Sequence, residues 1–218
     1  MQLRITMSKE LSKRASQKTQ KRCLKYSVSA DISKDKFDSC VSVIDMDQQV
    51  RVIATKSFKN SDGGFNEFDK WQEIKCKEPV PVVFIMEATG VYYEKLAWHL
   101  HRRGCHVSVV LPNKSKKYMQ CLGLKSKNDK IDSIGLARMG AEQCLPKWNA
   151  PLKIIVELRD ITRYRESLQE SRTKFNNQLS AYLCGEFVNG SIVEGLESMI
   201  ALLDQQIDET EKSIKEKL

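Results

Sequence analysis

Four acidic residues, Asp31, Glu87, Asp129 and Asp132, occupy positions where their side chains could do chemistry together. Asp31 lies in an alternating, strand-like run, and Glu87 directly follows a continuous apolar run that is typical of a strand covered on both faces. Asp129 and Asp132 fall at the start of a predicted helix with helical spacing, so they project from the same face. The sequence therefore predicts a carboxylate cluster built from two strands and one helix.

Clustered carboxylates repel one another unless cations neutralise them. Mg²⁺ prefers oxygen ligands, and two such ions about 4 Å apart can clamp both the attacking and the leaving oxygen of a phosphodiester. We therefore predict that Asp31, Glu87, Asp129 and Asp132 are the catalytic and metal-binding residues of a Mg²⁺ site, in which Mn²⁺ would substitute.

Each acid also has a structural explanation that the sequence leaves open. Asp31 could open a turn with Ser33, and Glu87 could simply meet water where its strand ends. Asp129 and Asp132 could be first-turn acids that the helix dipole favours. A purely structural account requires that all four acids stand at these positions by coincidence.

Basic residues are concentrated in two segments of this chain, which has a net charge of +8. Residues 1–25 carry eight Lys or Arg and one acid. The second group leads into the aspartate pair and comprises Lys114, Lys116, Lys117, Lys125, Lys127 and Lys130. Each phosphate that a lysine neutralises releases condensed counterions, so we predict that this second group binds a nucleic-acid backbone. The alternative is a solvated face.

The elements that must position the acids follow from hydrophobic periodicity. Alternating runs at residues 25–32, 38–45 and 49–58 predict an antiparallel three-stranded meander. The later elements alternate between helix and strand, namely a short helix near residues 65–74, a strand at 80–86, a helix at 92–103, a strand at 105–111 and a helix at 128–144.

This order is that of an α/β fold with an RNase H-like mixed sheet and flanking helices, although many other α+β domains share it and the order alone decides little. We expect three regions, namely a basic flexible arm at residues 1–25, the catalytic domain at 26–148 and a helical segment at 149–218. Within the last region, residues 152–182 and 191–218 have helical periodicity and many paired charges, which is typical of a helical hairpin or coiled coil.

The segments that carry the acids are residues 30–38 (ADISKDKFD), 86–93 (MEATGVYY) and 126–132 (SKNDKID). Together they resemble the DEDD transposases of bacterial insertion sequences, a group related to the Piv-type DNA invertases and built on a RuvC-like N-terminal domain. Residues 140–143 and the helical residues 157–169 are also similar to that family. The similarity covers roughly residues 26–175 and keeps all four acids in order.

The resemblance implies a DNA transposase or site-specific recombinase that binds Mg²⁺ through the four acids and cleaves and transfers DNA strands. It implies a C-terminal domain with an attacking serine, which we expect this chain to lack because the sequence stops at Leu218. It further implies a guide RNA, called a bridge RNA, that pairs with donor and target DNA. Dimers and tetramers are expected to assemble partly through the helical segment.

Two other functions remain open at this point. A structure-selective nuclease of the Holliday-junction-resolvase type would cut DNA without a serine domain. A truncated transposase remnant would bind nucleic acid or dimerise through residues 152–218 without catalysis. Cleavage by this chain alone favours the first, and nucleic-acid binding without metal binding favours the second.

Several classes of protein are disfavoured by the composition. No run approaches the roughly 20 apolar residues that span a bilayer, and the first 25 residues contain no apolar signal segment. We therefore expect a cytoplasmic protein with no membrane partner. The seven cysteines form no CxxC pair, so we expect reduced thiols. The histidines are interpreted as surface or packing residues, because none has metal-ligand spacing with a cysteine; they are His99, His101 and His106.

Overall fold

The computed structural model describes residues 22–123 and 129–218, with side chains described from Ile131 onward in the second range. The chain divides into two compact units, Met1–Ala150 and Pro151–Leu218. Most of the predicted basic arm lies outside the described residues, and so do Lys125, Lys127 and the side chains of Asp129 and Lys130.

The first unit opens with an antiparallel meander of β1 (Cys23–Ile32), β2 (Lys36–Asp45) and β3 (Val50–Lys59). The turn between β1 and β2 is tight, since the Ser33 amide donates to the Lys36 carbonyl at 2.9 Å. The turn between β2 and β3 is organised by Asp45, whose carboxylate accepts backbone hydrogen bonds from Asp47 and Gln49 at 3.0 Å each.

The start of the first strand differs from the sequence prediction. β1 begins at Cys23, inside the segment predicted as an arm, because residues 22 and 23 still pair with the end of β2. Cys23 is aligned with Asp45, and the Met46 amide donates to the Arg22 carbonyl at 3.1 Å. Local composition, which is polar and basic here, carries no signal of this long-range pairing.

Two further strands, β4 (Val82–Glu87) and β5 (His106–Val110), complete the sheet. β4 runs parallel to β1, and β5 runs parallel to β4, which gives the order β3-β2-β1-β4-β5. The continuous apolar run at β4 has the internal sheet position that such a run predicts. This mixed sheet with its antiparallel meander confirms the RNase H-like fold class.

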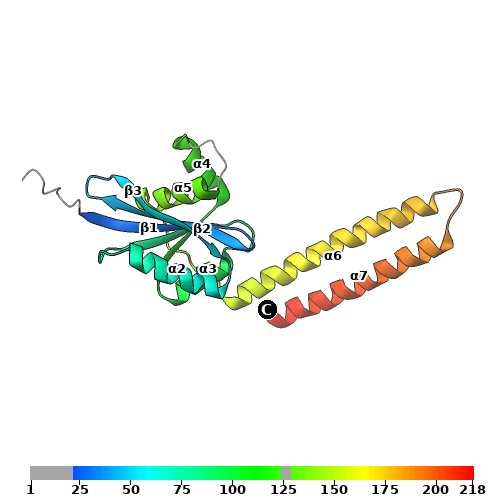
Figure 1. Ribbon diagram of the computed structural model, residues 1–218. Helices are drawn as coiled ribbons and strands as arrows, with labels where there is room; N and C mark the ends of the chain where they lie inside the picture. Colours follow the sequence, from blue (N-terminus) through cyan, green and yellow to red (C-terminus); the bar gives the residue numbers. More distant parts are fainter. Residues whose placement is uncertain (1–21, 124–128) are drawn as a thin grey trace, which may run out of the picture. The chain divides into compact units, whose positions relative to one another are not determined.

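Helices cover both faces of the sheet (Figure 1). α2 (Asp62–Lys75) and α3 (Glu94–Arg102) lie on one face, and α4 (Pro112–Cys121) and α5 (Asp129–Glu142) lie on the other. α4 was not predicted. Its lysine-rich sequence indicates a solvent-exposed connection, but Pro112 at its first turn is a residue that starts helices well.

The two faces of the sheet are packed differently. Under α2 and α3 the core is aromatic, with contacts among Phe37, Phe58, Phe65, Phe68 and Phe84. Under α5 the apolar cluster is smaller and comprises Ile85, Val110, Leu136, Met139 and Leu145. Buried serines of β1 and β2 make much of the remaining contact between the sheet and α5.

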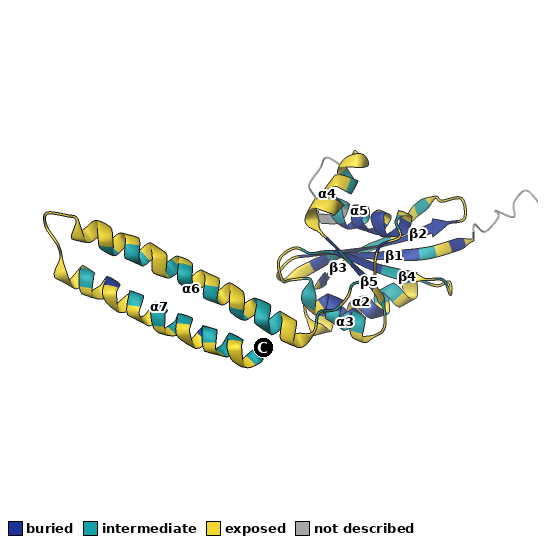
Figure 2. Cartoon of the chain, turned by 180° about the vertical axis from the view of Figure 1, so that it is seen from behind, coloured by how far each residue is buried: buried dark blue, intermediate teal, exposed yellow. Residues whose placement is uncertain are grey.

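The second unit is a helical hairpin of α6 (Lys153–Leu183) and α7 (Gly190–Lys217). The helices pack along each other and are joined by ion pairs, including Arg165 to Glu211 at 2.6 Å and Lys217 to Glu157 at 2.8 Å. Figure 2 shows that most hairpin residues are exposed or half-buried, whereas buried residues concentrate in the sheet unit. None of the helices in the described part of the chain has the length and apolar character needed to cross a membrane.

Candidate active site

Asp31 and Glu87 lie at neighbouring positions on one edge of the sheet. In the parallel pairing of β1 with β4, Ala30 is aligned with Met86, so each acid is the next residue on its strand. Adjacent strands are about 4.8 Å apart, and the carboxyl ends of parallel strands meet at the same edge. The fold therefore brings together two acids that are far apart in sequence.

Both acids also belong to the same face of the sheet. Ser29, two residues before Asp31, donates a hydrogen bond to the Ser133 carbonyl of α5 at 2.6 Å. Ile85, two residues before Glu87, packs in the cluster under α5. Because side chains alternate between faces along a strand, Asp31 and Glu87 project on the α5 side.

α5 lies close to the sheet, and it is oriented so that its first turn is the part nearest to Asp31 and Glu87. Ser133 contacts Ser29 on β1, whereas Gly140 lies over Ser27, farther from Asp31. A β-carbon at position 140 would come within 2.3 Å of the Ser27 hydroxyl oxygen, so only glycine allows this approach. Asp132, one residue before Ser133, is half-buried in that first turn.

The Glu87 carboxylate is held by two hydroxyl groups. Thr89 Oγ1 donates to Oε1 at 2.9 Å, and Ser115 Oγ from α4 donates to Oε2 at 2.5 Å. Such bonds to an ionised carboxylate are charge-assisted. Glu87 is therefore oriented by groups from its own loop and from a separate helix.

A fifth acid, Asp38, faces Asp31 directly across the β1–β2 pair. Its carboxylate accepts hydrogen bonds from Lys36 Nζ, at 3.2 Å, and from the Ser57 hydroxyl. Like charges placed directly opposite in a sheet are destabilising, and Lys36 offsets part of this cost. Asp38 falls within the ADISKDKFD segment, and counting back from the tight turn would have identified it as the partner of Asp31.

Basic residues border this edge on α4. Lys114, Lys116 and Lys117 are exposed on the helix whose first turn contacts Glu87 through Ser115. The other predicted phosphate-binding residues, Lys125, Lys127 and the Lys130 side chain, lie outside the described part of the chain. The described lysines thus belong to the helix that contacts Glu87, and their binding of a nucleic-acid backbone stays a prediction.

α4 is fixed to α5 at its other end. Tyr118 donates to Glu142 Oε2 at 2.6 Å, and Arg138 donates to Oε1 at 2.7 Å. Burial opposes ionisation of Glu142, but these two hydrogen bonds outweigh it and lower its pKa. Burial raises the pKa of the Tyr118 phenol, and the neighbouring Glu142 adds to that rise. Tyr118 therefore stays neutral as the donor to an ionised carboxylate.

Asp31, Glu87 and Asp132 each offer carboxylate oxygens, the ligand type that Mg²⁺ and Mn²⁺ accept. Within residues 22–123 and 131–218, no group of three or more His, Cys, Asp and Glu side chains is close enough to hold a metal ion. The fourth predicted ligand, Asp129, is outside that set, although its backbone begins α5. The donor atoms are of the type that a hard divalent cation takes, whereas the described side chains by themselves do not make a metal site.

Ser115 was missed in the sequence analysis, where it stands among lysines and has no local signal of burial. Only the tertiary contact of α4 with the end of β4 makes it a partner of Glu87.

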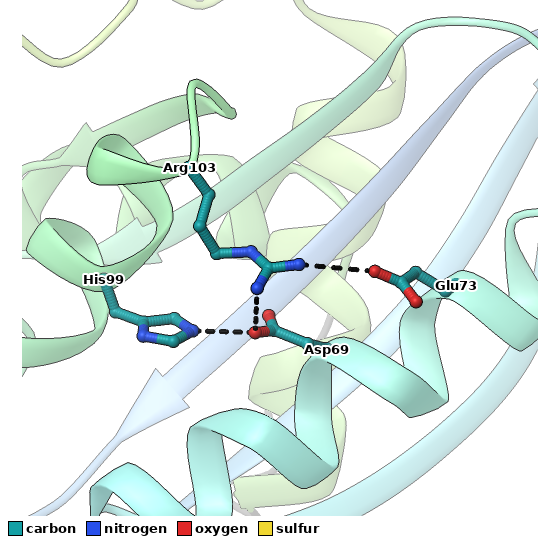
Figure 3. Close-up of polar contacts among 4 residues, drawn as sticks. All are labelled: Asp69, Glu73, His99 and Arg103. Atoms are coloured by element: carbon teal, nitrogen blue, oxygen red, sulfur yellow. Dashed lines mark hydrogen bonds and ion pairs between the residues drawn. The ribbon is translucent and has the colours of Figure 1, made fainter.

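The sequence analysis also missed Asp69, whose carboxylate is the polar partner of His99. His99 Nε2 is 2.8 Å from Asp69 Oδ2, and Arg103 contacts both Asp69 and Glu73 (Figure 3).

This second polar cluster joins α2 to α3, on the face opposite the candidate site. Asp69 is buried, and a buried carboxylate requires partners such as these. His99 therefore has a packing role, as expected, and His101 packs edge-on against Trp98 and Trp148.

The sheet order and the helices on both faces define an RNase H-like domain, in which Asp31 and Glu87 end the neighbouring strands β1 and β4. The family model DEDD_Tnp_IS110, described as a transposase, matches residues 28–188. The chain belongs to this DEDD transposase family, and so to a family of enzymes that act on DNA.

Curated relatives agree with this assignment. Pilin gene-inverting proteins of Moraxella bovis and Moraxella lacunata are each 32% identical over 188 residues, which cover 83% of this chain and 54% of theirs. The chain thus spans about half the length of the curated relatives it matches.

Solved structures with a similar chain path include RuvC and a Holliday junction resolvase. Thermus thermophilus RuvC, in complex with a Holliday junction substrate, has a TM-score of 0.38 at 12% identity, covering 54% of this chain and 93% of that one. The yeast mitochondrial Holliday junction resolvase has a TM-score of 0.40 at 10% identity, covering 56% and 80%.

Proposed function

We propose that this protein is a DNA transposase or site-specific recombinase of a bacterial insertion sequence, in which Asp31, Glu87, Asp129 and Asp132 bind Mg²⁺ and promote DNA strand cleavage and transfer. The observation that carries the proposal is the adjacency of Asp31 and Glu87 on the face crossed by α5. Family membership supports it, because the family takes its name from such a DEDD set.

Each group has a distinct part in the proposed reaction. The divalent cation would polarise the scissile phosphate and stabilise the charge that develops on its oxygens. Asp31 and Glu87 would hold it from the rigid sheet, and Asp132 with Asp129 would hold it from α5. Lys114, Lys116 and Lys117 would bind flanking phosphates and keep the DNA backbone at the edge.

The partners of the whole protein are also proposals. DNA is the proposed substrate, and the names of the Moraxella relatives support a reaction that rearranges DNA. A guide RNA is proposed from the family resemblance alone. A cytoplasmic location follows from the proposed substrate.

Self-association through the α6–α7 hairpin is proposed because that unit leaves large apolar side chains exposed. Ile155 is 54% exposed, Tyr164 is 52% exposed and Leu202 is 56% exposed. Side chains of this kind lose contact with water when a second copy packs against them.

Calorimetric titration with Mn²⁺ and Mg²⁺ tests the metal site. We expect Glu87→Gln, Asp31→Asn and Asp132→Asn each to weaken binding at least tenfold, because each removes a charged ligand. Asp62→Asn is the matched control, since Asp62 is an exposed acid in the first turn of α2. Unchanged affinity in Glu87→Gln, with and without duplex DNA, would refute the proposed site. Specific cutting of branched DNA by this chain alone would instead favour a junction-resolving nuclease.

A further inference from the structure

Ser115 is fully buried beside Glu87 although it stands between exposed lysines. Its hydroxyl has one proton and two acceptors within reach, Glu87 Oε2 at 2.5 Å and the Pro112 carbonyl at 3.0 Å. The contact with Glu87 is the shorter, and a carboxylate is the stronger acceptor. The proton is therefore directed to Glu87.

Thr89 holds the other carboxylate oxygen at 2.9 Å. An ionised carboxylate has about four lone-pair sites on its two oxygens, so one hydroxyl on each oxygen leaves both able to bind a cation. Donors at both ends also fix the rotation of the carboxylate group. The hydrogen bonds orient Glu87 without using up its capacity as a ligand.

The two hydroxyls differ in how easily water can replace them. Thr89 is exposed and lies two residues from Glu87 in the same loop. Ser115 is buried and comes from a separate helix. Loss of the Thr89 hydroxyl admits water, whereas loss of the Ser115 hydroxyl leaves Glu87 without a donor from α4.

The first turn of α4 also carries Lys114, and Lys116 and Lys117 follow in the next turn. α4 is held at this end by the Ser115–Glu87 bond and farther along by the Tyr118–Glu142 bond. The lysines that would bind a phosphate and the serine that holds Glu87 therefore belong to the same short helix.

We infer that Ser115 is a positioning residue for Glu87, whose hydroxyl holds the carboxylate in the orientation that receives the divalent cation and ties that orientation to the lysine-bearing helix α4. The inference rests on the proposed function, in which Glu87 is a cation ligand. Outer-shell hydrogen bonds of this type are typically worth about 10- to 100-fold in metal affinity.

The test is Mn²⁺ titration of the unsubstituted chain and of Ser115→Ala, Thr89→Ala and Glu87→Gln, each with and without a short DNA duplex. We expect Ser115→Ala to weaken Mn²⁺ binding about 10- to 100-fold, and Thr89→Ala to change it less than about threefold because water replaces an exposed hydroxyl. Duplex affinity without metal stays unchanged in Ser115→Ala, because the lysines remain. Ser115→Thr, which keeps the hydroxyl, restores most of the Mn²⁺ affinity.

The outcomes separate this inference from the proposed function. Loss of Mn²⁺ binding in Glu87→Gln but not in Ser115→Ala overturns the positioning role and leaves the proposed function intact. A loss in Ser115→Ala that Ser115→Thr does not recover, together with a lower unfolding temperature, assigns the effect to packing and also overturns it. No effect of Glu87→Gln, or no binding by the unsubstituted chain with or without duplex, overturns both.

Discussion

The sheet unit and the helical hairpin are stabilised by different interactions. In the sheet unit, five phenylalanines pack against one another under α2 and α3, with little or no exposure. In the hairpin, whose residues are all described, the buried apolar side chains are Leu168 and Leu196. Ion pairs between α6 and α7 supply much of the specific contact instead.

This difference has consequences for function. Close-packed cores resist small shifts, so the sheet can hold Asp31 and Glu87 at fixed positions. A unit with few buried apolar contacts opens more easily, and exposed ion pairs contribute little. The hairpin is thus suited to adjust its packing, and the following substitutions test whether the two units respond as differently as their contacts imply.

The largest effect is expected for Phe68→Ala. Phe68 is fully buried and contacts four aromatic neighbours, so its truncation should destabilise the sheet unit by about 3–5 kcal/mol. All three tryptophans, Trp71, Trp98 and Trp148, lie in that unit. Tryptophan fluorescence in denaturant therefore reports on it separately from the helical signal of the hairpin. A loss below about 1 kcal/mol would contradict the assignment of the main core.

A smaller effect is expected for Gly140→Ala. The added β-carbon would meet the Ser27 hydroxyl oxygen at 2.3 Å and Ile85 Cγ2 at 3.0 Å, so α5 must shift, at a cost of about 1–3 kcal/mol. Gly195→Ala in the hairpin is the matched control, because nothing lies within 4 Å of its added carbon. There, the better helix propensity of alanine should slightly stabilise α7. Equal effects in both units, measured by thermal unfolding, would be evidence against the close packing of α5.

Arg165→Met tests the hairpin ion pairs and is expected to be milder. The Arg165 and Glu211 side chains are 30% and 37% exposed, so solvent screening limits the expected loss to about 0.3–1 kcal/mol. Unfolding followed by far-ultraviolet circular dichroism at low and high salt measures it. The difference between variant and unsubstituted chain should shrink at high salt, and a salt-independent difference would indicate lost packing instead.

The smallest effect is a pH dependence of the hairpin. Hydrogen bonding to Lys217, with its positive charge, lowers the pKa of Glu157. The resulting stabilisation is present above the unfolded pKa of about 4.3 and is lost as the pH falls through the lower folded value. Helical signal at pH 3 compared with pH 5 should show a loss that Glu157→Gln reduces. Lys217→Met should reduce it equally, and no reduction in either would exclude this pair as the cause.

The fold could be predicted from the sequence wherever the local hydrophobic pattern agrees with the long-range packing. The apolar run before Glu87 predicted an internal strand, and the alternation before Asp31 predicted a strand; both strands are present. α4 was missed because its lysines indicate solvent and its buried side, Ser115, shows no apolar period.

The candidate site could be predicted from the sequence only in part. Asp31 and Glu87 could be placed as neighbours because parallel strands have a simple register. Asp38 could have been placed opposite Asp31 by counting back from the turn between their strands, but Ser115 could not be assigned a role, since its contact depends on a helix that composition does not reveal. The roles of all four predicted acids remain a prediction for the metal titration to test.

The parallel pairing of β1 with β4 also bears on how the chain folds. The β1–β2–β3 meander needs only tight turns, whereas β4 can join β1 only after the meander and α2 between them have been spanned. Non-local pairing of this kind forms slowly, because loop closure must precede the contacts that compensate for it. Asp31 and Glu87 would thus become neighbours late, so a newly made chain acquires its candidate cation site only when the sheet is nearly complete.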